Sequence, residues 1–399
     1  MDTKNSMSGA RRILGVAMIL TGIIGMAGQF AKGGSLRKEA GSDSIAVYAA
    51  AAPAQAAVEM PRIENAKVES RTVAGSLDAT FRGIVAQAEQ PEWLGYSVDQ
   101  VAGNRGVCCG NYRDDGYCGT CRLEHDNDNG ATTTTSQPGA GTIKLEGVRQ
   151  LVVLFRLEGK SVKRIRMASE DCTLDAGGSP FVWLTGVKPA DSVALLETYV
   201  RGGNFGERAD HGLAHGALAA IALHADASAD RALESFVKPD EREGLRRQAA
   251  FWLGAARGRA GFSLLQRMAK NDPSSEVRAH VTFALSVSHE PGALDEMIRM
   301  AHDDTSSRVR GQALFWLAQK AGQRAASTIT GAIENDPDTD VKKKAVFALS
   351  QLPKDEGVPK LIEVAQTNRN PEVRKQAMFW LGQSHDPRAL AFFEQVLSK

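Results

Sequence analysis

Five cysteines are the residues whose type and spacing could most readily do chemistry, and they lie in one stretch: Cys108, Cys109, Cys118, Cys121 and Cys172. Cys118 and Cys121 have the C-x-x-C spacing that both metal knuckles and thiol oxidoreductases use. Zinc would want four ligands, and because adjacent cysteines rarely bind one ion together, His125 could replace one of them. A redox role would need a strand–helix–strand setting, and no such pattern surrounds the motif.

Structural disulfides are the prediction that these cysteines favour. A metal site at Cys118, Cys121 and His125 and redox catalysis stay open as alternatives. Cys172 is expected to join the later strands to the cysteine-rich loop. Because five is an odd number, one thiol is left free or pairs with another chain.

Other reactive residue types occur without the partners that chemistry would need. His211 and His215 have the i, i+4 spacing that can hold a metal on one helix face, but without a clear third ligand they are expected to be a solvent-facing pair. Asp175 precedes two glycines and predicts a turn. The sequence has no glycine-rich phosphate loop, nucleophile elbow or His-Glu-x-x-His run. No catalytic residue and no cofactor are therefore predicted.

A set of aromatic and polar residues recurs at a constant interval in the C-terminal half. It comprises Trp252, Trp316 and Trp380, with glutamines four positions earlier at Gln248, Gln312 and Gln376. Halfway between, His280 and Lys344 stand in the places of the glutamines. These eight residues could form a binding stripe, since tryptophan is a favoured interface anchor. The alternative is that each large tryptophan packs against a small neighbour, Ala284 or Ala348.

These residues are positioned by a repeat of about 32 residues, and the tryptophans mark every second unit of it. Its clearest row is a set of phenylalanines, expected to belong to the core: Phe251, Phe283, Phe315, Phe347 and Phe379. Apolar residues at helical spacing, with a break within each unit, predict two short helices per unit and about six units. One helix pair cannot bury its own apolar stripe, but stacked pairs share a continuous core.

Polar residues punctuate the same repeat. Asp-Pro pairs are expected to cap helices at Asp272, Asp336 and Asp386, and glycines to mark turns at Gly292, Gly322 and Gly357. A cation recurs early in five units: Arg246, Arg278, Arg310, Lys342 and Arg374. This row is expected to pair with the acids at the turns and so join adjacent units, with binding of an acidic ligand as the alternative.

The segments "DPSSEVRAHVTFALS" and "NPEVRKQAMFWLGQSHDPRALAFFEQVL" resemble HEAT-type repeats, in the short form named after phycobilisome bilin lyases. The resemblance covers roughly residues 207–399. It implies an α-α superhelical solenoid, and it implies a protein-binding scaffold, because such repeats mostly serve in that way. It does not carry lyase chemistry to this chain, because a repeat type does not define an enzyme.

The N-terminal part predicts export. Arg11 and Arg12 precede an apolar run over residues 13–30, which is typical of a signal peptide or of an uncleaved membrane anchor. Residues 32–75 are rich in Ala, Gly and Ser and predict a flexible linker. Apolar residues that alternate near 94–98 and 151–157, a further probable strand at 181–187 and a helix after them predict a small β-rich domain over 76–204.

The predicted fold class is therefore α+β and multidomain: a signal or anchor (1–31), a linker (32–75), a β-rich cysteine-containing domain (76–204) and a solenoid of about six HEAT-like repeats (205–399). A formal net charge of +1 over 399 residues does not favour nucleic acid as a partner. We predict an exported, periplasmic or otherwise extracytoplasmic adaptor for a protein or peptide, with a possible N-terminal membrane tether. The alternatives are an enzyme with lyase-like, thiol- or metal-dependent chemistry in the cysteine domain, and a purely structural envelope protein.

Overall fold

The computed structural model describes residues 60–102, 106–108, 111–112, 119–124, 149–205 and 212–398, all within the compact unit of residues 57–399. The predicted export segment and most of the predicted linker lie outside these residues. No helix in the described part of the chain is long and apolar enough to cross a membrane.

The β-rich region is built on a five-stranded sheet with the strand order β2-β10-β3-β7-β8. Its strands in that order are Val68–Thr72, Phe181–Thr185, Glu92–Asp99, Gln150–Glu158 and Ser161–Ser169. The first three are mutually parallel, and β3, β7 and β8 are antiparallel neighbours. The predicted strands near 94–98, 151–157 and 181–187 are confirmed. A tight turn joins β7 to β8, and its residues Gly159 and Lys160 both have positive φ.

A smaller three-stranded sheet has the order β1-β9-β6, and β4 and β5 form a separate two-stranded sheet. Their bounds are Ile63–Glu64, Thr173–Asp175, Thr120–Arg122, Val107–Cys108 and Asn111–Tyr112. Strands β1 and β2 fall inside the range predicted as linker, so the β-rich region begins earlier than the sequence indicated. Both strands are short and mostly polar, and they carry no alternation that would reveal a buried face.

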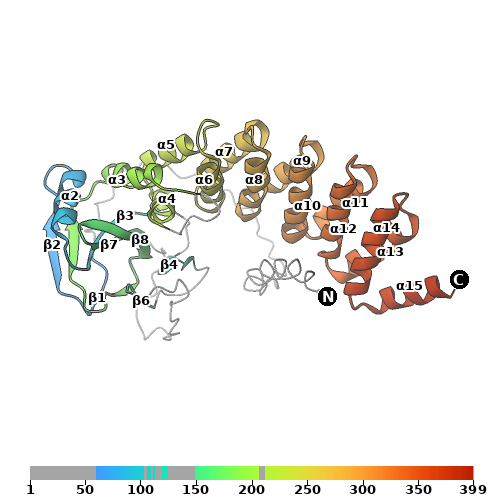
Figure 1. Cartoon of the computed structure of the whole chain (residues 1–399), viewed down its shortest axis with the longest axis horizontal. Coiled ribbons are helices and arrows are strands. Elements are labelled where there is room, and N and C mark those ends of the chain that lie inside the picture. Colours follow the sequence, from blue (N-terminus) through green and yellow to red (C-terminus); the bar gives the residue numbers. More distant parts are fainter. Residues whose placement is uncertain are drawn as a thin grey trace, which may run out of the picture. The chain divides into compact units, whose positions relative to one another are not determined.

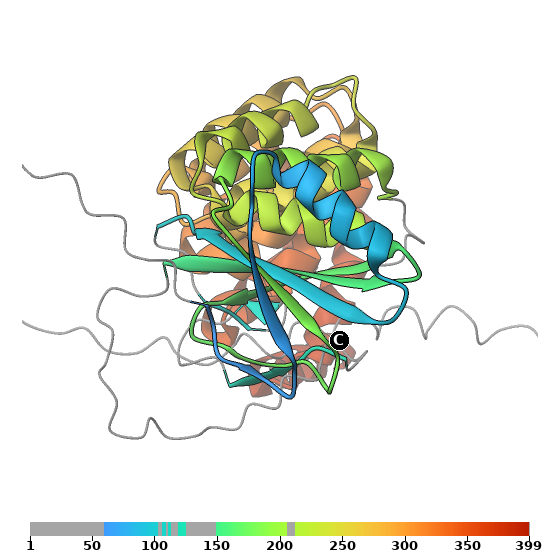
Figure 2. The same cartoon turned by 90° about the vertical axis from the view of Figure 1, so that its left-hand side faces the viewer.

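The central strands β10, β3 and β7 of the five-stranded sheet are covered on both faces (Figure 2). On one face, Tyr96, Val153 and Phe155 pack into the large core shared with the helices. On the other, Trp93, Leu154 and Trp183 pack with the smaller sheet, including Cys121 and Leu174. Because side chains alternate along a strand, the continuous apolar run of β7 is what a sheet covered on both sides requires.

Helices cover the first face and then continue as a row (Figure 1). Helix α2 (Leu77–Gln87) and helix α3 (Pro189–Gly202) precede six helix pairs. The first helices of the pairs are α4 (Leu213–Leu223), α6 (Glu243–Ala256), α8 (Ser275–Val287), α10 (Ser307–Ala321), α12 (Thr339–Ser350) and α14 (Pro371–Gln383). The second helices are α5 (Ala227–Phe236), α7 (Gly258–Asn271), α9 (Ala293–Asp303), α11 (Gln323–Asn335), α13 (Lys354–Thr367) and α15 (Pro387–Leu397). First helices pack against first helices along one side of the row.

The core of the row consists of residues that recur once in each unit. In the five first helices from α6 to α14, one leucine of each helix is almost completely buried: Leu253, Leu285, Leu317, Leu349 and Leu381. A second row holds only small, buried residues, where each second helix approaches its first: Ala229, Gly261, Ala293, Ala325, Gly357 and Ala389. Gly357 was predicted to mark a turn, but it lies inside α13. Close packing explains why this residue is a glycine, because a Cβ here would come within 2.6 Å of the Leu349 carbonyl oxygen.

The capping acids are only partly where the sequence placed them. Asp386 caps α15 with Pro387 in the first turn, as predicted. Asp272 and Asp336 instead follow the ends of α7 and α11, while the next helices are capped by Ser274 and Asp338. The difference arises because these two carboxylates bind the side chains of Arg246 and Arg310.

The β-rich region and the helices form one unit rather than two separate domains. The Tyr96 hydroxyl and the His224 Nε2 atom lie 2.7 and 2.9 Å from the Ser192 hydroxyl, so one buried hydrogen-bond chain joins β3, α3 and the end of α4. The Ala220 carbonyl oxygen lies 2.7 Å from His224 Nδ1. Burial raises the pKa of Tyr96 and lowers the pKa of His224 to about 4. Nothing in the sequence indicated this link, because its three residues are far apart in the chain.

The lowered pKa of His224 predicts a pH-dependent stability. Above about pH 6.5 the imidazole is neutral in both the folded and the unfolded state. As the pH falls towards about 4, the unfolded chain binds a proton that the folded chain does not. The free energy of unfolding should therefore fall by roughly 1.4 kcal/mol per pH unit over this window. Urea titrations from pH 7 to pH 4 should show a smaller loss for His224→Gln, and equal losses would contradict a neutral buried His224.

Candidate functional site

The predicted tryptophans belong to an unbroken chain of aromatic contacts along the first helices. The rings of Phe251 and Phe283 are stacked with centroids 5.7 Å apart, and those of Phe315 and Phe347 with centroids 6.0 Å apart. Each tryptophan packs edge-on against the phenylalanine before it in the chain. Trp316 contacts Phe283 and Trp380 contacts Phe347, both at 4.8 Å between centroids. We call these eight rings the aromatic ladder: Trp252, Phe251, Phe283, Trp316, Phe315, Phe347, Trp380 and Phe379.

The phenylalanines of the ladder are not core residues, and this prediction was wrong. Phe251, Phe283, Phe315 and Phe347 are half-buried, and Phe379 is 55% exposed. The leucines two positions later are the buried row. A row of core residues and a row of surface residues that stack from unit to unit have the same repeat period. The period alone therefore could not show which of the two rows is buried.

The tryptophans combine the two interpretations that the sequence left open. All three are half-buried and pack against the core, while Ala284 and Ala348 are fully buried. The indole nitrogens of Trp316 and Trp380 are buried without a hydrogen-bond partner among the described residues. The N–H edges of these two rings therefore point into the stack, and only the remaining ring surface is open to a partner.

The polar candidates border the ladder. Gln248, Gln312 and Gln376 are half-buried, each one turn before a tryptophan. His280 packs against the edge of Phe283 with centroids 5.7 Å apart, and burial lowers its pKa to about 4, so it is neutral near pH 7. Lys344 is exposed and crosses Gly311, where a side chain would collide with it.

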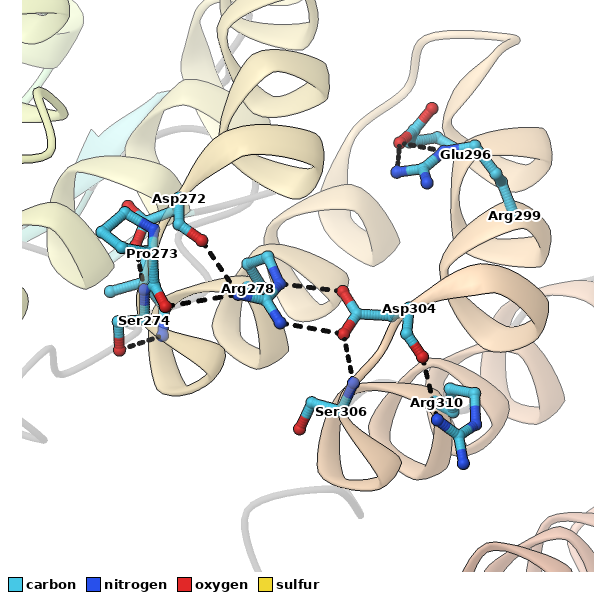
Figure 3. Close-up of polar contacts among 10 residues, drawn as sticks. Asp272, Pro273, Ser274, Arg278, Glu296, Arg299, Asp304, Ser306 and Arg310 are labelled. Carbon is cyan, nitrogen blue, oxygen red and sulfur yellow. Dashed lines mark hydrogen bonds and ion pairs between the residues drawn. The ribbon is translucent and has the colours of Figure 1, made fainter. Parts of the chain in front are cut away.

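The predicted pairing of the cation row is confirmed for three rungs: Arg246 with Asp272, Arg278 with Asp304, and Arg310 with Asp336. In each rung, two guanidinium nitrogens donate to the two carboxylate oxygens of the next unit. Figure 3 shows this arrangement for Arg278 and Asp304. Arg278 Nη1 also donates to the Asp272 carbonyl oxygen at 2.9 Å, so successive rungs are connected. The hydrogen bond to Asp304 raises the pKa of Arg278.

The cysteine and histidine candidates are only partly described. Cys121 and Cys172 are buried in the core of the smaller sheet, and neither is a free thiol. Cys109, Cys118 and His125 lie outside the described residues, so cysteine connectivity and the alternative metal site stay predictions. In the part of the chain that the structure describes, no group of three His, Cys, Asp or Glu side chains could hold a metal.

Two smaller predictions concern local structure. Asp175 is the last residue of β9, and the predicted turn follows it at Gly177 and Gly178. Its carboxylate accepts hydrogen bonds from the Asn65 side chain and the Gly177 backbone. His211 lies outside the described residues, and His215 packs against Phe205 with centroids 4.8 Å apart.

Paired helices in a row, with core residues that recur once in each pair, define an α-helical repeat protein. The model for HEAT repeats matches residues 230–318 and 326–399. Residues 230–399 of this chain thus contain HEAT repeats. Repeats of this kind form helical scaffolds that are able to bind proteins.

Solved structures with similar helical repeats are distant. The complex of CpcE and CpcF of phycocyanin lyase from Nostoc sp. PCC7120 is 22% identical, with a TM-score of 0.30 over 39% of this chain and 99% of that chain. The E. coli protein YibA is 21% identical, with a TM-score of 0.35 over 54% and 82%. A mutant of Kap121p is 15% identical, with a TM-score of 0.31 over 48% and 25%. At these scores the likenesses carry no argument about activity or partner. A comparison with curated proteins gave no match.

The most buried rung predicts a large stability effect. The side chains of Arg246 and Asp272 are only 5% and 1% exposed. Asp272→Asn should lower the free energy of unfolding by about 3–5 kcal/mol, because it leaves a buried guanidinium without its counter-charge. Asp355→Asn, which removes a 95% exposed carboxylate from a pair with Arg388, should change it by less than about 1 kcal/mol. Equal effects in urea denaturation would refute a structural role for the rung.

Proposed function

We propose that this chain is an extracytoplasmic scaffold that holds an extended segment of a partner protein along the aromatic ladder. The observation that carries the proposal is the continuity of the ladder. Eight rings from five successive first helices touch one another without a break, and most of them are half-buried.

The dimensions of the ladder fit an extended peptide. Packed helices lie roughly 8–10 Å apart, so the four steps from α6 to α14 span about 32–40 Å. At about 3.3 Å per residue, an extended segment of about 10–12 residues covers that length. Aromatic rings that are already held by their neighbours lose little conformational freedom when a partner covers them, which favours binding.

The border of the ladder supplies polar groups for the backbone of such a segment. The amides of Gln248, Gln312 and Gln376 can both donate and accept hydrogen bonds. The neutral imidazole of His280 and the exposed ammonium of Lys344 take the same places in the units between. The rings of the ladder would make apolar contacts with a partner, and the glutamine amides beside them would form hydrogen bonds with its backbone.

Export is the second part of the proposal. The charged residues and apolar run of residues 11–30 support it, and the cysteines of the β-rich region suit an oxidising compartment, where they would form disulfides. An uncleaved apolar segment would tether the scaffold to a membrane. An enzyme with chemistry in the cysteine-rich stretch stays a sequence-based hypothesis, because Cys109, Cys118 and His125 are not among the described residues.

Site-specific crosslinking tests the ladder directly. A photoreactive phenylalanine analogue at Phe347 or Phe379 in the full chain should give a discrete crosslinked protein in the native host. The same analogue at Leu390, which is 62% exposed on α15, serves as the matched control and should not give that product. An identical product from Leu390 would show that the ladder is not the recognition surface.

Ring removal should weaken the same complex. The double variant Phe283→Leu and Phe347→Leu keeps apolar volume but removes two central rings. We expect binding of the crosslinked partner to fall about 5- to 150-fold, since each aromatic contact contributes about 0.5–1.5 kcal/mol. Circular dichroism should show an unchanged helix content. Unchanged affinity in the folded variant would count against the proposal.

Export has its own measurement. A reporter enzyme that is active only outside the cytoplasm, fused after residue 59, should be active in cells. Replacing four apolar residues within 13–30 by aspartate should abolish this activity without lowering the amount of fusion protein, because charges prevent insertion of the segment. Full activity of the charged variant would exclude export through this segment.

A further inference from the structure

The cation row contains one rung that is chemically incomplete. One repeat after the last arginine of the three complete rungs stands Lys342, and one repeat after the last aspartate stands Asn368. The fourth rung therefore keeps a cation but lacks a carboxylate. This pair stands between the unit of α12 and α13 and the unit of α14 and α15.

A complete rung uses its carboxylate in two ways. Asp304 Oδ1 accepts a hydrogen bond of 2.8 Å from the Ser306 backbone N–H, which orders the turn before α10. Both carboxylate oxygens also accept from Arg278, at 2.9 and 3.0 Å (Figure 3). The same two roles recur at Asp336, where the backbone N–H of Asp338 is the donor.

Asn368 keeps the first role and lacks the second. Its Oδ1 atom accepts a hydrogen bond of 3.0 Å from the Asn370 backbone N–H. The other side-chain atom is an NH₂ group, a donor where the aspartates present a second acceptor oxygen. Lys342 Nζ donates to the Glu334 carbonyl oxygen at 2.7 Å, in the last turn of α11. Two donors therefore belong to a rung that in three other units is closed by an anion.

A cavity of about 470 Å³ opens at this rung between α11 and α13. Lys342, Lys360 and Arg369 line it together with Asn368 and Asn370. Among the described residues, none of the three cations is in an ion pair. Two acids on its edge, Glu334 and Glu363, are exposed, so the lining carries one excess positive charge.

The corresponding cavity three units earlier lies between α5 and α7 and measures about 570 Å³. It contains Asp272, whose carboxylate is already held by Arg246. Arg267 there is paired with Glu234. The same groove thus exists with and without its internal carboxylate, and the two cavities serve as matched sites in one molecule.

We propose that the cavity at Lys342 and Asn368 binds a carboxylate supplied by a ligand, which completes the fourth rung from outside the chain. Carboxylate is the ligand class because it is the group that the three complete rungs hold in this place. It can come from an acidic side chain of a polypeptide or from a small dicarboxylic acid. The site involves the second helices and stands apart from the aromatic ladder.

The test measures binding of two probes to the full chain: fluorescent hexaglutamate by anisotropy and glutarate by displacement of it. Saturable binding of hexaglutamate that weakens with added salt is expected. Asn368→Asp supplies an internal carboxylate and should weaken binding at least tenfold while raising the melting temperature. If glutarate displaces hexaglutamate at a similar concentration of carboxylate groups, the natural ligand is a small dicarboxylic acid. If glutarate displaces it only at a much higher concentration, the natural ligand is a polypeptide.

The controls separate this site from general charge and from the proposed function. Lys354→Ala removes an exposed lysine outside the cavity and should leave binding unchanged. The Phe283→Leu and Phe347→Leu variant should also bind hexaglutamate normally, so loss of the ladder and loss of this site are distinguishable. Lys342→Gln should weaken binding, which provides a second variant if Asn368→Asp does not fold. Absent binding to the parent, or equal binding to both cavity variants and the parent, would overturn the proposal.

Discussion

Each helix pair of residues 212–398 can bury its apolar stripe only against the neighbouring pairs, and the rest of the structure depends on this constraint. It explains why the leucine row is almost fully buried in every unit and why the position between first and second helices admits only alanine or glycine. It also explains why the first pair packs on the five-stranded sheet: the sheet face at β7 and β8 gives α4 an apolar neighbour on the side where no earlier pair stands. The β-rich region is thereby part of the same core.

Stacking brings charges under cover as well. The turn of one unit approaches the first helix of the unit before it, so an acid in the turn and an arginine in the helix are buried together. A buried carboxylate is tolerated only with a counter-charge and satisfied hydrogen bonds, and the bidentate guanidinium supplies both. Asp272 and Asp336, which the sequence identified as helix caps, follow the ends of the second helices for this reason. A pairing partner in the preceding unit outweighed the local signal of an Asp-Pro dipeptide.

Much of the fold could be predicted from the sequence because similar residues recur at a constant interval of about 32. The repeat period located the helix pairs, alternation located β3 and β7, and a short apolar run located β10. The sequence could not tell which repeated rows face inwards: the period is identical for Leu253 and Phe251, although one is buried and the other half-buried. Strands β1 and β2 were missed because they are short and polar, and the Tyr96–Ser192–His224 link because it joins distant residues. The tryptophans were found by their spacing, but only the folded chain could show that the N–H edges of two of them face the stack.

Two periods in one sequence point to two separate demands. Packing needs one row per unit, and the leucines, valines and small residues satisfy it throughout the stack. Nothing in packing requires tryptophan and alanine to alternate from one unit to the next, since a stack of identical units would also close. The alternation of tryptophan and alanine has its effect at the surface. There, each stacked pair of phenylalanines is flanked by tryptophans, and the aromatic contacts continue over five helices. The same reasoning applies to the fourth rung. The arginine–aspartate rungs are the same in three units because they stabilise the stack. The fourth rung has Lys342 and Asn368 and lacks the internal carboxylate. Its cation and amide donor can therefore bind a carboxylate from another molecule.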